Sequence, residues 1–150
     1  MIVAGERGVF FNAGTIIAGI LGIIFGAYLR DKLKRPAYLF IAASAALVGV
    51  GIFHTKFVAS QLLFGFYYSR FEAMHVVSAL VFFLLSAFFL VLTGRLVSRK
   101  SNIGYFAVAA GILPLFFIIF QSPVWEHLSV LVINVAVFAI AFYLRKMGPL

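Results

Sequence analysis

Few residues in this chain have the chemistry to bind a metal, a haem or a proton, and they lie within or beside long apolar stretches. Glu72 and His75 stand near the start of one such stretch, three residues apart, so an α-helix would present both on one face. Glu126 and His127 open another, and His54 ends a third. Ionisable groups inside apolar segments are costly unless they have a function or a partner. These five residues therefore form the candidate site.

Four interpretations of the five residues are open. A proton relay or a polar ligand pocket would be built on Glu72, His75 and Glu126; with His127 and His54, the pocket would bind a lipid headgroup or a small polar ligand. A haem b would take His75 and His127 as its two axial ligands. A zinc ion with a bound water, held by His54, His75, Glu72 and Glu126, would suit a metal-dependent lipid hydrolase embedded in the membrane. In the plainest interpretation, the groups only meet headgroups and water at the membrane surface.

The composition excludes an ordinary soluble domain. Of the 150 residues, 65% are hydrophobic and 11% are charged, and the mean hydropathy is +1.16. A soluble domain is about half apolar and about a quarter charged. Because the chain has no cysteine, disulfides, thiolate metal sites and cysteine nucleophiles are excluded. The chain is therefore expected to be an integral membrane protein.

Five apolar stretches are long enough to cross a bilayer, which needs about 20 residues per helix. We predict an all-α bundle of five transmembrane helices that forms a single domain over residues 1–150. A longer aromatic connection at 55–70 should separate the second span from the third. The predicted spans are 10–29, 37–53, 71–92, 103–120 and 125–144.

The basic residues orient the bundle. Segments 30–36 and 94–102 and the end of the chain carry nine of the twelve Lys and Arg residues. The positive-inside rule places these segments in the cytoplasm. In the cell membrane, the N-terminus is then expected on the outer side and the C-terminus on the cytoplasmic side. The candidate residues then lie at the outer ends of their spans. The net charge of +8 is explained by anionic headgroups on the cytoplasmic side, without nucleic acid.

Other residues suggest how the helices pack. Asn12 and Asn134 are candidates for structural hydrogen bonds between helices, since amides often serve this purpose in membranes. Small residues recur every four positions in the first span, which favours close packing against another helix of the chain or in a homo-oligomer. These residues are Gly14, Ala18, Gly22 and Gly26.

Four segments in this order resemble the prokaryotic integral-membrane family called domain of unknown function 998. They are GVFFNAGTIIAGIL (8–21), ALVGVGIF (46–53), MHVVSALVFFLLSA (74–87) and PVWEHLSVL (123–131). The match rests on Asn12, the GVGIF segment, His75 and Glu126. The resemblance implies a helical bundle, usually of six spans, with no established activity. The usual first span of the family and the polar motif after it are not found here.

We therefore expect a small non-enzymatic subunit or binding protein with an outward-facing polar pocket. This interpretation requires no cofactor. Haem b belongs to the redox alternative, and zinc belongs to the lipid-hydrolase alternative. The sequence leaves open whether the protein is an enzyme, and which membrane protein or second copy it associates with.

Overall fold

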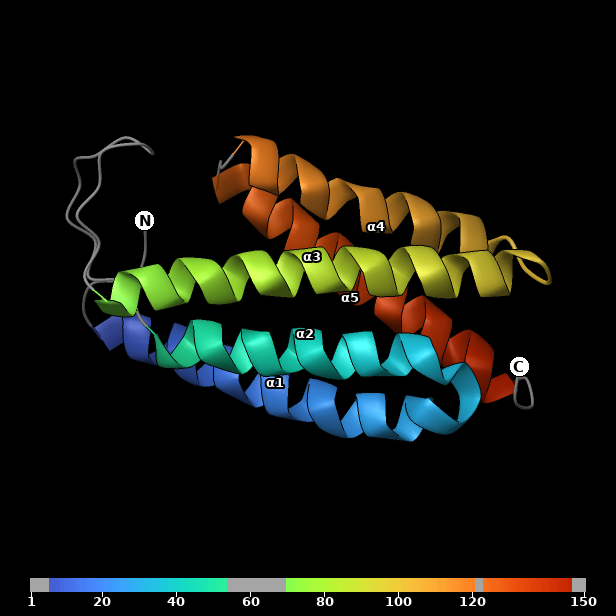
Figure 1. Ribbon diagram of the computed structural model, residues 1–150, viewed down its shortest axis with the longest axis horizontal. Helices are drawn as coiled ribbons and strands as arrows, with labels where there is room; N and C mark the ends of the chain where they lie inside the picture. The colour runs from blue at the N-terminus through green and yellow to red at the C-terminus, as the bar shows by residue number, and fades with distance from the viewer. Residues whose placement is uncertain (1–5, 54–69, 121–122, 147–150) are drawn as a thin grey trace.

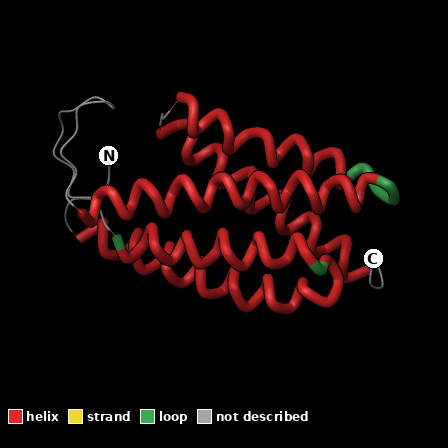
Figure 2. Tube along the Cα trace, in the orientation of Figure 1, coloured by secondary structure: helices red, strands yellow, loops and turns green. Residues whose placement is uncertain are grey.

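The computed structural model describes residues 6–53, 70–120 and 123–146, and within them the side chains of 9–53, 73–116 and 124–146. These residues form five α-helices and no strand, as Figures 1 and 2 show. Four of the helices are long and apolar enough to cross a membrane, and α4 contributes a shorter apolar segment. The predicted all-α fold is confirmed. The helices are α1 (Glu6–Leu33), α2 (Arg35–Ile52), α3 (Arg70–Ser98), α4 (Ile103–Phe120) and α5 (Pro123–Lys146).

Two helices extend well past the apolar spans that the sequence predicts. α1 begins four residues before the span 10–29 and ends four residues after it, and α3 continues six residues beyond 92. The added turns contain Arg30, Lys32 and Arg95, which are good helix formers and lie in the last turn of their helices. Cations there are stabilised by the negative end of the helix dipole. The predicted connection 55–70 lies almost wholly outside the described residues.

The connection between α1 and α2 is a single residue, Lys34. Its φ of 51° and ψ of −117° match the first central position of a type II′ turn, where glycine is the usual residue. The Lys34 amide donates to the Arg30 carbonyl at 2.8 Å, and its carbonyl accepts from Ala37 at 3.1 Å. Pro36 then occupies the start of α2, where its missing N–H is not needed. Most of the predicted loop 30–36 is thus helical.

Glycines allow α1 and α2 to pack at backbone distance. A Cβ placed on Gly19 would lie 2.8 Å from the carbonyl oxygen of Ser44, and one on Gly26 would lie 2.6 Å from Ile41 Cγ1. A Cβ on Gly22 would overlap the side chain of Ser44. Gly14, by contrast, has no atom within 4 Å of such a Cβ. The contact therefore runs through three of these glycines and leaves Gly14 outside it.

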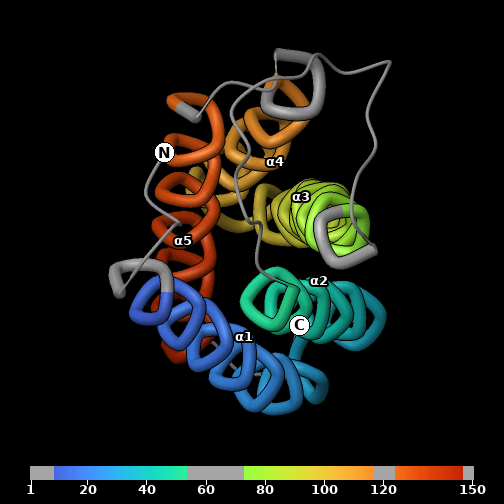
Figure 3. Tube along the Cα trace, turned by 90° about the vertical axis from the view of Figure 1, so that its left-hand side faces the viewer, coloured from blue at the N-terminus to red at the C-terminus, as the bar shows by residue number. Residues whose placement is uncertain are grey.

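Helix α3 is the centre of the bundle and packs on both α2 and α4. Its side chains Phe83, Phe89 and Leu90 are almost fully buried. In Figure 1, α5 runs behind α3, from beside α4 at one end to beside the α1–α2 turn at the other. Figure 3 shows α5 between α4 and α1 in the view along the bundle. At the α1–α2 turn, Lys32 Nζ donates to the Leu144 carbonyl of α5 at 2.6 Å.

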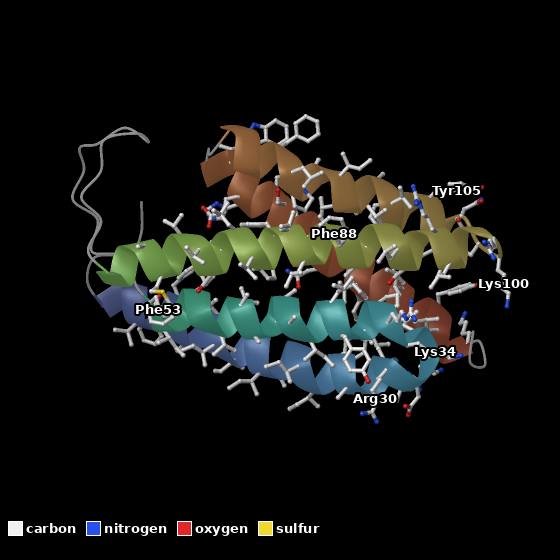
Figure 4. The ribbon with its side chains drawn as sticks, viewed as in Figure 1. Arg30, Lys34, Phe53, Phe88, Lys100 and Tyr105 are labelled. Atoms are coloured by element: carbon white, nitrogen blue, oxygen red, sulfur yellow. The ribbon has the colours of Figure 1, made fainter. Side chains whose placement is uncertain are left out.

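The outer surface of the helices is apolar, and the described Lys and Arg side chains lie at one end. Large hydrophobic side chains such as Phe10 (80% exposed) and Phe138 (75% exposed) cover the sides of the bundle. Apolar surface on this scale indicates a lipid environment. Figure 4 shows Arg30, Lys34 and Lys100 at the end opposite to Phe53. We call the former the basic end, and the end where α2 stops and α3 starts the α2–α3 end.

Candidate functional site

The ring of His75 is fixed against the end of α2. His75 lies in the second turn of α3, and its Nδ1 is 3.1 Å from the Val50 carbonyl oxygen and 2.5 Å from that of Phe53. A carbonyl oxygen can only accept a hydrogen bond, so Nδ1 carries the proton and donates to both. The last carbonyls of a helix have no partner within it, and His75 supplies one here. In the neutral ring, Nε2 is then a hydrogen-bond acceptor.

Two glycines bring the neighbouring helices close enough for this contact. A Cβ on Gly49 would lie 2.7 Å from the hydroxyl of Ser78, three residues after His75 on the same face of α3. A Cβ on Gly51 would lie 2.8 Å from the carbonyl oxygen of Asn12 on α1. The GVG sequence at the end of α2 therefore packs closely against both α1 and α3. The contact of Ser78 with α2 and the role of these glycines were not predicted from the sequence, although the GVG spacing and the His75–Ser78 spacing could have suggested them.

Asn12 is the second polar side chain at this junction. It is half-buried, and its Oδ1 is fully shielded and has no hydrogen-bond partner among the described residues. A buried acceptor without a partner costs about 1–3 kcal/mol. Together, Oδ1 of Asn12 and Nε2 of His75 make the α2–α3 end rich in acceptors.

Glu126 and His127 begin α5 in a different part of the bundle. Glu126 is half-buried in the first turn, where the positive end of the helix dipole favours a carboxylate, and His127 is exposed. Beside them, Trp125 stacks on Phe116 of α4 with 5.9 Å between the ring centroids. α5 packs mainly on α4 and touches α3 only slightly, whereas His75 faces α2.

The remaining predicted ligands fall outside what the structure describes. His54 lies between the described segments 6–53 and 70–120. Glu72 lies in the first turn of α3, but its side chain is not described. Among the described residues, no three His, Asp or Glu side chains gather as metal ligands. The zinc and haem alternatives stay predictions.

Asn134 does not form the hydrogen bond to a neighbouring helix of the chain that its position suggests. Its Nδ2 donates to the Val130 carbonyl of its own helix at 2.8 Å, and the residue is exposed. Among the described residues Asn134 thus makes no hydrogen bond to a neighbouring helix, and its structural role between helices stays a prediction.

Long apolar helices, packed through glycines and with the described Lys and Arg side chains at one end, define a helical membrane protein with several spans. The chain belongs to the family described as Protein of unknown function (DUF998), whose sequence model matches residues 1–143. The resemblance inferred from Asn12, GVGIF, His75 and Glu126 is thus confirmed. Three of these four features meet at the α2–α3 end. No curated protein and no solved structure matches the chain.

Proposed function

We propose that the protein is a non-enzymatic binding protein of the cell membrane that recognises a primary ammonium group at the α2–α3 end. The group belongs to a lipid headgroup or to a small polar ligand at the outer surface. The observation that carries this proposal is the fixed ring of His75, whose Nδ1 donates to the carbonyls of Val50 and Phe53.

The argument for an ammonium group is the excess of acceptors. Nε2 of the neutral His75 ring accepts a hydrogen bond, and so does the unpartnered Oδ1 of Asn12. An ammonium group carries three donors and a positive charge. The negative end of the α2 dipole favours such a cation. Among the side chains that the structure describes, every Lys and Arg lies toward the basic end, so none of them occupies this role.

The test compares two lipids that differ in donors but not in charge. Short-chain phosphatidylethanolamine, which has a primary ammonium, is titrated into the purified protein in detergent, and bound lipid is counted by native mass spectrometry. Phosphatidylcholine, whose quaternary ammonium has no N–H, is the reference. The proposal expects at least tenfold tighter binding of phosphatidylethanolamine, about 1.4 kcal/mol.

Two variants locate the binding. Asn12→Leu removes the free acceptor without touching the His75 contact and should abolish the preference. Asn134→Leu, on the exposed face of α5, is the matched control and should retain it. Equal binding of the two lipids, or a preference that survives in Asn12→Leu, would refute the proposal. Soluble ethanolamine as competitor separates a free ligand from a lipid.

A second candidate, a single-haem redox subunit, is favoured by the same tautomer. Histidines that bind a metal commonly donate their other ring nitrogen to a carbonyl, as Nδ1 of His75 does here. A Soret band in protein purified from native membranes, lost in His75→Ala, is the expected result for this candidate. A colourless preparation would refute it.

A further inference from the structure

Asn134 lies on the side of α5 that no other described helix covers. It stands at the middle of this helix of 24 residues (Pro123–Lys146). Its neighbours on the same face, Leu131 and Phe138, are 60% and 75% exposed. The opposite face of α5 makes the contacts within the bundle, through Ser129, Ile133, Ala136, Ile140 and Leu144, which are all buried.

This position leaves most of the hydrogen-bonding groups of the Asn134 carboxamide unused in the hydrocarbon layer. The carboxamide has two N–H donors and an oxygen that accepts. Within the part of the chain that the structure describes, it forms one hydrogen bond, from Nδ2 to the Val130 carbonyl. Lipid tails offer no partner for the rest. Polar side chains within membrane helices almost always face protein or water.

We propose that the exposed face of α5 is the contact surface for a second copy of this chain, with Asn134 at its centre. A carboxamide is self-complementary, because each copy supplies the donor and the acceptor that the other needs. Around a two-fold axis normal to the membrane, Nδ2 of one Asn134 donates to Oδ1 of the other, and the reverse bond forms by symmetry. A contact between identical copies therefore needs no further polar residue.

The residues in line with Asn134 have the spacing of a helix pair. They follow one another at alternating intervals of four, three and four along α5, which is the pattern of left-handed packing between two helices. This row contains Asn134, and all of its members are exposed: His127, Leu131, Asn134 and Phe138.

The absence of cysteine from the chain makes a direct test possible. Leu131→Cys is introduced alone, and native membranes are oxidised before denaturing electrophoresis. A disulfide-linked band at twice the chain mass of 16.5 kDa is expected. Ile24→Cys, on the exposed face of α1, is the matched control and should give at most a trace of that band.

The role of the amide is tested in the Leu131→Cys background. Adding Asn134→Leu should weaken association in lipid bilayers about tenfold, as measured by energy transfer between labelled copies. Asn134→Gln, which keeps a carboxamide, should retain most of the association. Because Asn134 is exposed, its substitution should leave the helical content of the monomer unchanged. Cross-linking no greater than in the control, association unaffected by Asn134→Leu, or a product containing a different protein would each overturn the proposal.

Discussion

The contact between α1 and α2 can be tested by making one substitution at two glycines of the same helix. A Cβ on Gly14 meets no atom within 4 Å. On Gly19, it would lie 2.8 Å from the carbonyl oxygen of Ser44 and 2.9 Å from the amide nitrogen of Val48. Both of these atoms belong to the backbone, so they can move only if α2 moves. Gly19→Ala should therefore push the two helices apart, and Gly14→Ala should not.

The expected free energies follow from two opposing terms. Replacing glycine by alanine within a helix stabilises it by about 0.5–1 kcal/mol, and both variants share this gain. Overpacking a close contact costs about 1–3 kcal/mol, and only Gly19→Ala has this cost. Gly14→Ala should thus be slightly more stable than the parent. The difference between the two variants isolates the packing cost, about 1–3 kcal/mol.

The free energy of unfolding is measured in mixed micelles by titrating a denaturing detergent. Trp125 is the single tryptophan, and its stacking on Phe116 makes its fluorescence a probe of the α4–α5 contact, away from both substitutions. Circular dichroism, as a second probe, tests whether unfolding is one transition. If Gly19→Ala is as stable as Gly14→Ala, the backbone-level contact between α1 and α2 does not exist.

Substitutions at three further positions test other contacts by the same unfolding measurement. Lys34→Gly should stabilise the protein by about 1 kcal/mol, because glycine adopts a positive φ without strain. Lys34→Ala, the control, should not stabilise it. Equal effects of the two substitutions would show that the lysine charge, and not backbone strain, sets the stability. Lys32→Met should cost about 1–2 kcal/mol by removing the bond to the Leu144 carbonyl, and no loss would mean that this bond contributes nothing. His75→Ala should cost about 1 kcal/mol and speed amide exchange near Phe53; unchanged exchange would contradict its capping role.

Hydropathy predicted the number and type of the helices because it reports which segments can cross lipid. It could not locate the helix ends, since backbone hydrogen bonding continues through charged residues. Arg30 and Lys32 therefore lie inside α1, although they are too polar for an apolar span. The one-residue turn at Lys34 was also hidden, because a positive φ usually falls on glycine or asparagine and a lysine gives no signal for it.

The small residues that recur every four positions in α1 show why such a repeat does not predict which residues face a neighbouring helix. Successive helix residues are rotated by about 100°, so four residues advance the direction by about 40° beyond a full turn. From Gly14 to Gly26 this drift reaches about 120°, and the two cannot face the same neighbour. Gly19 and Gly26, seven apart, differ by only about 20°. The contact with α2 accordingly uses Gly19 and not Gly14.

The site could be predicted only as a set of residue types. The spacing of Glu72 and His75 indicated a shared face, but the partner of His75 is the end of α2, more than twenty residues earlier in the chain. A sequence gives no direct signal for a histidine that caps another helix. The family resemblance pointed to the correct segments, since Asn12 and GVGIF meet His75 there, while its fourth residue, Glu126, begins a helix that packs elsewhere.

The two asparagines illustrate how depth in the membrane selects a partner. Asn12 lies near the α2–α3 end of the bundle, where its Oδ1 is shielded and has no hydrogen-bond partner among the described residues, so the proposed ligand is the group that would pair with it. Asn134 lies at the middle of α5, where only protein offers a partner. Ligand binding and self-association therefore use different helices. A substitution that abolishes one of them should leave the other intact. Asn12→Leu should leave cross-linking through Leu131→Cys unchanged, and a loss of both functions in one variant would show that they share a structural element.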